Sequence, residues 1–408
     1  METESSRVKR RVIFVVDYPF SERDCTRFGV DEFLSRGYLP EVWDLSAVFL
    51  RHLASQGPSP TLRIRVTRLL RRAEIKSHCD SLADSDNVIL VGGLHGHQAR
   101  SGSYFMRCLY HSPSTVHALA SGELMDIGEP LKGPSGITTK TFLALKRPQR
   151  FRRLISKLGI GISLLGEWSW HDPGAASLPR TIDQVWAGTS TGHIRSELLD
   201  ANTTVNYIHT LDYDQLLNLQ HLDPTVARRI VYIDHLGSVD ATALGQAAKI
   251  PAEVYGQLID KVLVRLERQL ERKVTIAAHP GSERGQLEKL YQGREVVYGQ
   301  TARLIREADL VVTSHYTTAV SWVVSVKVPL VVITSCRFER QQCLENAAMI
   351  EVLGCDSIDT DEGDRWNPSF AVDENRYANY ASRYVKRPGT PELSFWSVVA
   401  DFMDGQRS

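Results

Sequence analysis

The sequence carries no net charge, because its 48 lysines and arginines equal its 48 aspartates and glutamates. Without a global positive field we expect no nucleic-acid partner, and any function that depends on charge must be local. Long hydrophobic runs are also missing. The longest, such as residues 12–16, 88–91 and 330–333, are far shorter than the roughly 20 residues that span a bilayer. The polar residues 1–11 precede an apolar run too short for a signal-peptide core, so we expect a cytoplasmic protein.

Cysteine is scarce, with six residues in 408, and no two of them form a CxxC pair or stand at zinc-ligand spacing from histidines. This argues against a disulfide framework and a zinc site, and it predicts buried or idle thiols. A Walker A lysine loop and a GxGxxG loop after a strand are absent as well. Neither an ATPase nor a dehydrogenase has support, and we expect no metal and no cofactor.

What is present is the composition of a globular protein, 42% apolar and 24% charged, in a chain long enough for two domains. Continuous apolar runs are typical of parallel strands that are covered on both faces. In the first half such runs alternate with helix-length stretches, which predicts a doubly wound α/β domain. The predicted strands are residues 12–16, 41–45, 88–92, 116–119, 161–165 and 184–187, and the helices include residues 60–77 and 139–158.

The second half repeats this alternation more regularly, which predicts a second α/β domain. Its predicted strands are residues 230–233, 274–278, 295–298, 310–313 and 330–334, and its predicted helices are residues 252–271, 284–291, 301–307 and 318–325. We therefore expect an N-terminal domain over residues 1–220 and a C-terminal domain over residues 221–385. The aromatic segment 386–408 could cross back onto the first domain.

Polar residues in the second half follow the ends of predicted strands. They are Asp234, His279-Pro280, Tyr298-Gly299 and Ser314-His315-Tyr316. Ligands of open α/β sheets bind at this edge, outside the carboxyl ends of the strands. The hydroxyls of residues 314–318 also stand where a helix begins, and a helix start offers N–H groups to a phosphate. Ordinary N-capping by Ser or Thr explains the same pattern, so this motif alone decides little.

Four segments taken in order resemble the nucleotide-sugar domain of bacterial surface-polysaccharide glycosyltransferases. They are residues 274–282, 294–302, 309–319 and 328–333, and the resemblance covers roughly residues 229–335. GT-B sialyltransferases and Kdo transferases share His-Pro and Ser/Thr motifs of this kind. The resemblance implies the GT-B fold, with two Rossmann-like, doubly wound domains that face each other across a cleft. It also implies transfer of a sugar, Kdo or a related 2-keto acid sugar, from a CMP-activated donor to a bacterial surface-glycan acceptor.

The resemblance also implies roles for individual residues. In these families the His of the His-Pro motif contacts the donor phosphate or the cytidine, and the Ser/Thr motif binds the phosphate. The first role falls on His279, beside Pro280, and an imidazole there can stabilise developing negative charge. The residues of the Ser/Thr motif are Ser314, His315, Thr317 and Thr318. The turn that would border the base or ribose consists of Tyr298, Gly299, Gln300 and Thr301, although a capped helix start explains it equally well.

Two carboxylates are candidates for catalysis. Asp234 ends a predicted strand about 45 residues before His279, as in retaining β-Kdo transferases, and the resemblance implies a glycosyl adduct on it. It could otherwise act as a general base, or simply cap a βα loop. Glu167 lies beside two tryptophans and could assist proton transfer. His95 and His97, on a glycine-rich turn, could contact an acceptor, with surface exposure and no role as the alternative for all three.

Competing interpretations remain open. The triplet Asp212-Tyr213-Asp214 matches the DxD motif with which GT-A enzymes hold a metal, but its place near the domain junction favours a structural role. The basic clusters at residues 63–72 and 146–157 are either solvated helix faces or contacts to anionic headgroups. A lipid-linked glycan acceptor would bring the protein to the inner membrane. The alternative functions are an inverting sialyltransferase-like enzyme, a UDP-sugar transferase or epimerase, and a non-catalytic sugar-nucleotide binding module.

Overall fold

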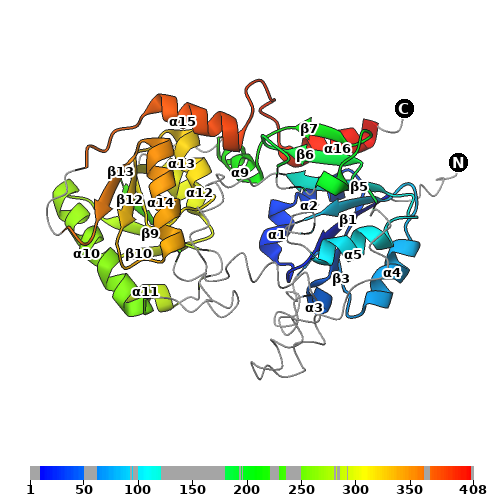
Figure 1. The fold of residues 1–408 in the computed structure, drawn as a ribbon, viewed down its shortest axis with the longest axis horizontal. Coiled ribbons are helices and arrows are strands. Elements are labelled where there is room, and N and C mark those ends of the chain that lie inside the picture. The colour runs from blue at the N-terminus through cyan, green and yellow to red at the C-terminus, as the bar shows by residue number, and fades with distance from the viewer. Residues whose placement is uncertain are drawn as a thin grey trace, which may run out of the picture. The chain divides into compact units, whose positions relative to one another are not determined.

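Two parallel sheets carry the fold (Figure 1). The computed structural model describes residues 10–49, 62–91, 94, 100–120, 180–192, 194, 196–220, 229–235, 250–279, 282, 285–291, 293–362 and 368–405. The predicted strand at residues 161–165 and the predicted helix at 139–158 lie outside these ranges. None of the helices in the described ranges combines the length and apolarity needed to cross a membrane.

The first sheet has seven strands in the order β3-β2-β1-β4-β5-β6-β7. The strands are β1 (Arg11–Val16), β2 (Leu39–Asp44), β3 (Arg65–Arg68), β4 (Asn87–Leu90), β5 (Thr115–Ala120), β6 (Gln184–Ala187) and β7 (Thr204–Tyr207). The chain builds β1, β2 and β3 in one direction and then returns to place β4 on the other side of β1. The strand order therefore reverses between β1 and β4, which is where open α/β sheets bind ligands.

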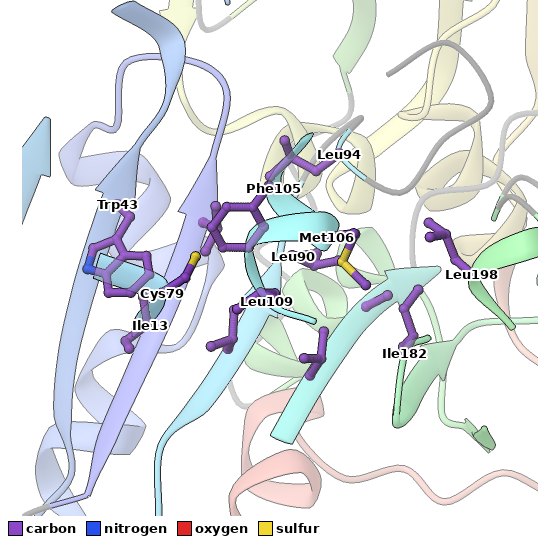
Figure 2. Close-up of a cluster of buried hydrophobic side chains, with 14 of the residues drawn as sticks. Ile13, Trp43, Cys79, Leu90, Leu94, Phe105, Met106, Leu109, Ile182 and Leu198 are labelled. Carbon is purple, nitrogen blue, oxygen red and sulfur yellow. The ribbon is translucent and has the colours of Figure 1, made fainter. Parts of the chain in front are cut away.

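Apolar side chains cover both faces of the first sheet, as continuous apolar strands require. Figure 2 shows one of these clusters, to which Trp43, Phe105 and Met106 belong, together with Ile182 from a later segment. The helices of this half are α1 (Glu22–Arg27), α2 (Val30–Ser35), α3 (Ser46–Phe49), α4 (Arg72–Asp80), α5 (Arg100–Cys108) and α9 (Leu211–Leu219).

The predicted helix at residues 60–77 is wrong in its first part, because Arg65–Arg68 forms the edge strand β3 and α4 begins only at Arg72. Basic and apolar residues alternate here at a period of two, as Arg63 and Arg65 alternate with Ile64 and Val66. That period belongs to a strand and not to a helix. This basic cluster is therefore not the helix face that the sequence predicted.

The second sheet has six strands in the order β10-β9-β8-β11-β12-β13. The strands are β8 (Arg229–Ile233), β9 (Val274–Ala278), β10 (Glu295–Tyr298), β11 (Ala308–Thr313), β12 (Leu330–Thr334) and β13 (Asp356–Asp359). The order reverses between β8 and β11, so this sheet has its own ligand-binding edge. Two parallel Rossmann-like sheets confirm the predicted fold class. The predicted strands 274–278, 295–298 and 330–334 have the observed bounds.

Helices cover the second sheet. They are α10 (Ala252–Leu270), α11 (Gln286–Leu290), α12 (Thr301–Arg306), α13 (Val320–Val326), α14 (Arg340–Leu353) and α15 (Glu374–Tyr380), and a π-helical turn follows at Ala381–Val385. The long helix α10 contributes Ile259, Leu263 and Leu266 to the core, at the spacing of one helix face. Asn346 of α14 is fully buried among apolar residues and binds two backbone carbonyls.

The last helix, α16 (Phe395–Gly405), packs on the first sheet, although it comes at the end of the chain (Figure 1). Trp396 contacts the rings of Phe14 and Phe33, each at 5.8 Å, and its indole nitrogen donates to the carbonyl oxygen of Arg27 at 2.8 Å. Gly29 has φ +59°, and a Cβ there would lie 2.3 Å from Trp396. Only glycine suits this position, because both the backbone conformation and the close approach exclude a side chain.

Candidate functional site

Three histidine rings come together where the strand order of the second sheet reverses. His235 follows β8, His279 follows β9 and His315 follows β11. The ring centroids of His235 and His315 are 4.5 Å apart, and those of His235 and His279 are 5.9 Å apart. His235 therefore lies at the centre of the histidine cluster, the name we use for these three residues.

Strand register places the three rings together. Ile233 of β8 pairs with Ala277 of β9 and with Thr313 of β11, so the three neighbouring strands end at nearly the same level. The strands are held there because their side chains are buried on both faces. The one or two residues that follow each strand therefore emerge at the same edge of the sheet. Three segments that are distant in sequence thus deliver their imidazoles to one point.

His315 is fixed by a buried hydrogen-bond network below it. Its Nδ1 lies 3.1 Å from the hydroxyl of Tyr255 and 3.2 Å from that of Ser314, and 3.4 Å from the amide nitrogen of Gln342. All three neighbours can donate, and the amide nitrogen can do nothing else. We therefore assign Nδ1 as the acceptor and Nε2 as the nitrogen that carries the proton.

Ser314 lies at the centre of this network and is completely buried. Its hydroxyl is hydrogen-bonded to Tyr255, and it is 2.9 Å from the hydroxyl of Tyr232. Its carbonyl oxygen accepts from the side-chain amides of Gln342 and Asn346, each at 2.8 Å. These contacts turn Ser314 toward the protein interior, where it supports the loop that carries His315.

The imidazoles of the cluster are neutral at pH 7. Burial lowers the pKa of His315 to about 3, with a further contribution from His235. The pKa of His279 is lowered to about 4, mainly by burial, and to a lesser extent by the charges of His235 and then Arg23. Burial lowers the pKa of His235 as well. Neutral imidazoles can donate from one nitrogen and accept at the other, so the cluster can bind an anion and can take up a proton.

Asp234 lies just below the cluster and is buried, with 1% of its surface exposed. One carboxylate oxygen accepts a hydrogen bond of 2.8 Å from the hydroxyl of Tyr291, and its backbone N–H donates to the carbonyl oxygen of Ala277. The charge of Asp234 contributes to raising the pKa of Tyr255 and Tyr291, after burial. The carboxylate therefore faces buried tyrosines rather than open solvent.

Other predicted site residues lie apart from the cluster or serve local structure. The hydroxyl of Thr317 accepts from the backbone N–H of Ala319, and that of Thr318 is hydrogen-bonded to Asp212. The first of these is a local contact in the loop before α13, whose N-cap residue is Ala319 and has no side-chain cap, so ordinary N-capping by Ser or Thr does not explain this motif. Pro280 lies outside the described residues, and so do Glu167, His95 and His97.

The predicted base-binding turn follows β10, two strands away from β8. Tyr298 directs its hydroxyl to both oxygens of Glu288, at 3.1 and 3.2 Å, and Gly299 has φ +71°. Gln300 and Thr301 start α12. The turn borders an open hollow of about 570 Å³ that is lined mainly by polar and charged side chains. The turn therefore follows the strand next to β9, which leads to His279, and lies two strands away from His235.

The DxD triplet lies at the start of α9. Asp214 accepts a hydrogen bond of 2.7 Å from the backbone N–H of Phe395, so it anchors the segment that leads into α16. Asp212 is buried at 6% exposure beside the charge of Arg27. Within the described residues, no group of three or more His, Cys, Asp or Glu side chains is arranged to hold a metal ion.

Sequence reasoning missed His235, Tyr255 and the two amides of α14. His235 matches no motif, but its position two residues after a strand at the reversal of strand order was a usable signal. Tyr255 and Gln342 come from helices and carry no signal of this kind, because only the tertiary fold brings α10 and α14 to the loop after β11.

No family model matches the chain, and no curated protein matches it. Among solved structures, the chain is similar to the wall teichoic acid polymerase TagF, with 11% identity and a TM-score of 0.49 over 98% of this chain and 88% of that chain. It is similar to the calicheamicin glycosyltransferase CalG4, with 12% identity and a TM-score of 0.43 over 98% of this chain and 100% of that chain. MurG of Acinetobacter baumannii gives 12% identity and a TM-score of 0.40, over 97% and 99%. The assignment of the fold therefore rests on the strand order of the two sheets.

Proposed function

We propose that the chain is a GT-B glycosyltransferase that binds the phosphate of a nucleotide-activated sugar at the histidine cluster. The observation that carries this proposal is the convergence of three neutral imidazoles at the reversal of strand order in the second sheet. Glycosyl transfer needs a group that stabilises the charge developing on the leaving phosphate and a group that accepts the proton of the acceptor hydroxyl. Neutral imidazoles supply both functions.

His315 suits the first role. Because Nδ1 accepts from the network below, the Nε2–H is the donor available to an oxygen of the leaving phosphate. His279 is the second phosphate contact in this proposal, as the resemblance to nucleotide-sugar domains implies. His235, between them, is the proposed base, because the approach of an anionic donor raises the pKa of a neighbouring imidazole and so helps it to take a proton.

We assign Asp234 a positioning role. A nucleophile must reach the anomeric carbon, whereas this carboxylate is buried and accepts from Tyr291. The carboxylate fixes Tyr291 by a hydrogen bond, and its charge acts on Tyr255. Tyr255 is in turn hydrogen-bonded to Ser314 and His315. The retaining mechanism with a glycosyl adduct on Asp234 is the alternative, and it is distinguished by substitution of the carboxylate.

The finer identity of the substrates is also a proposal. The resemblance of residues 274–333 to CMP-sugar transferases supports a CMP-activated donor, with Kdo or a related 2-keto acid sugar, and a bacterial glycan or lipid-linked glycan acceptor. A lipid-linked acceptor would imply contact with the inner membrane. The alternatives are an enzyme that uses a UDP-sugar and a protein that binds a sugar nucleotide without transferring the sugar. The experiment must distinguish both from a CMP-sugar transferase.

The test is a binding screen followed by a turnover assay. Calorimetry with CMP, CDP, UDP and GDP, with and without EDTA, identifies the nucleotide and any metal requirement. His279→Ala should weaken binding of the preferred nucleotide about 10-fold or more, because a phosphate contact is lost. The matched control is His111→Ala, since His111 is exposed on the first domain. Unchanged affinity in His279→Ala, or no release of nucleotide from any activated sugar by the wild-type chain, would refute the proposal.

A further inference from the structure

The ligand edge of the first sheet carries two arginines that the proposed function does not use. Arg23 and Arg27 lie on α1, the helix that follows β1 beside the reversal of strand order between β1 and β4. Residues four apart on a helix lie on the same face, so the two guanidinium groups are neighbours. Their positive charges repel each other, and this repulsion destabilises the folded chain unless something offsets it.

Two other arginines of the protein, Arg36 and Arg294, are paired with acids. Arg36 binds Glu32 and Asp401, and Arg294 binds Asp260 and Glu267. In the described part of the chain, by contrast, Arg23 and Arg27 have no carboxylate within ion-pair distance. The Nε of Arg27 is buried without a hydrogen-bond partner, and its guanidinium group lies 5.9 Å from the ring of Phe28.

The nearby acids are already engaged. Asp24 accepts from the backbone N–H of Ser21 at 2.9 Å and from its hydroxyl at 2.6 Å, as the third helical residue of the capping box in which Ser21 is the N-cap of α1. Asp212 accepts from the hydroxyl of Thr318, and burial raises its pKa. Burial and then the charge of Arg27 lower the pKa of Arg23, although the charges of Asp24 and Asp212 act in the opposite direction. A buried donor without a partner and two adjacent cations are costly unless a ligand satisfies them.

We propose that Arg23 and Arg27 bind a phosphate group of a substrate at the carboxyl edge of the first sheet. A phosphate carries close to two negative charges and several acceptor oxygens, which matches two guanidinium forks. A carboxylate offers one charge and would leave half of the pair uncompensated. The phosphate belongs either to the donor or to a phosphorylated acceptor, and this assignment of the substrate rests on the proposed function.

The charge of Arg23 also acts on His279, where it is the third contribution to the lowered pKa after burial and His235. A phosphate bound by Arg23 is therefore within electrostatic reach of the histidine cluster. Burial remains the main reason that His279 is unprotonated, and the charge of Arg23 adds to it.

The experiment measures binding of inorganic pyrophosphate to the full chain by calorimetry, without turnover. The double variant Arg23→Gln/Arg27→Gln should lose at least about 10-fold in affinity, because charge-assisted bonds are lost. The matched control is Lys261→Gln/Arg268→Gln, which removes the same charge from exposed positions of α10. Absence of pyrophosphate binding in the wild type, or equal affinity in the double variant, would overturn the proposal.

Further variants test whether a loss of binding reflects misfolding, and which substrate carries the phosphate. Arg23→Gln alone tests the site at an exposed residue, and Arg23→Lys/Arg27→Lys should restore part of the affinity because the charge is kept. If the double variant also weakens the nucleotide found in the screen above, the phosphate belongs to the donor. If nucleotide affinity is unchanged while pyrophosphate binding is lost, it belongs to the acceptor. Loss of pyrophosphate binding would stand even if no sugar were ever transferred, so the two proposals fail separately.

Discussion

The carboxyl edges of the two sheets share one topology and differ in electrostatics. At the second sheet three imidazoles are uncharged, because burial lowers their pKa. At the first sheet two guanidinium groups keep their charge, because arginine does not lose its proton in proteins. In our two proposals, the same reversal of strand order supplies two kinds of anion site. A neutral site can exchange protons during a reaction, whereas a fixed cationic site can only hold and orient.

The two halves also differ in how they are completed. The core of the second sheet takes in Leu216 of α9, the helix that directly precedes this half, whereas the first sheet needs α16 from the far end of the chain. His209 and Asp214, at the start of α9, hold that segment through Leu393 and Phe395. The core of the first sheet is therefore incomplete without α16.

The largest expected effect tests this dependence. Trp396→Ala should lower the free energy of unfolding by about 3–5 kcal/mol, because a large aromatic side chain with 3% exposure leaves a cavity among phenylalanines. Hydrogen exchange should speed up in β1 and β4 far more than in β8 and β9. Leu393→Ala, at an exposed position, is the control. Equal acceleration in both sheets would show that the halves unfold as one unit.

The next effect concerns the neutral edge. His315→Ala should reduce the rate of sugar transfer about 100- to 1,000-fold, because it removes a donor to the leaving phosphate. Tyr255→Phe should cost about 10-fold, since it removes one hydrogen bond that fixes the ring. Steady-state kinetics with the identified donor would measure both. A loss in Tyr255→Phe as large as that in His315→Ala would make the tyrosine itself catalytic.

Acidification should destabilise the protein through its buried histidines. The folded-state pKa values of His279 and His315 are about 4 and about 3, below an unfolded value of about 6.5. Between these limits the unfolded chain binds more protons, so stability is full above pH 6.5 and falls as the pH falls. At pH 5 each histidine should cost up to about 2 kcal/mol. Urea unfolding at pH 7.5, 6 and 5 measures the slope, and His315→Gln should remove one histidine's share. A flat profile would contradict neutral imidazoles.

Much of the second half could be predicted from the sequence because its strands are continuous apolar runs. β9 is buried along its whole length and its bounds were predicted without error. β3 differs from the predicted helix because its arginines alternate with other residues at a period of two, which is that of a strand. The local sequence pattern predicts strands and helices well where their side chains are fully buried. It predicts them poorly at a sheet edge, where charged and apolar residues alternate.

The site was only partly accessible to sequence reasoning, for a different reason. His279 and His315 follow strands and match a motif, so they could be named in advance. Which way a side chain turns could not be predicted. Ser314 stands in the same motif, yet its hydroxyl is buried between two tyrosines from β8 and α10. The contacts that fix His315 are long-range, and no local pattern records them.

The smallest expected effect bears on the role of Asp234. Asp234→Asn keeps an oxygen that can accept the hydroxyl of Tyr291, so a positioning role predicts a stability change within about 1 kcal/mol and a loss of activity below about 10-fold. Tyr291→Phe should cost more, about 1–3 kcal/mol, because it takes a hydrogen-bond donor from a buried carboxylate. An amide cannot attack the anomeric carbon, so a nucleophilic role predicts loss of essentially all transfer in Asp234→Asn while nucleotide binding survives. Thermal unfolding and transfer rates on the same two variants decide between these roles, because the larger effect moves from Tyr291→Phe to Asp234→Asn if the carboxylate forms the adduct.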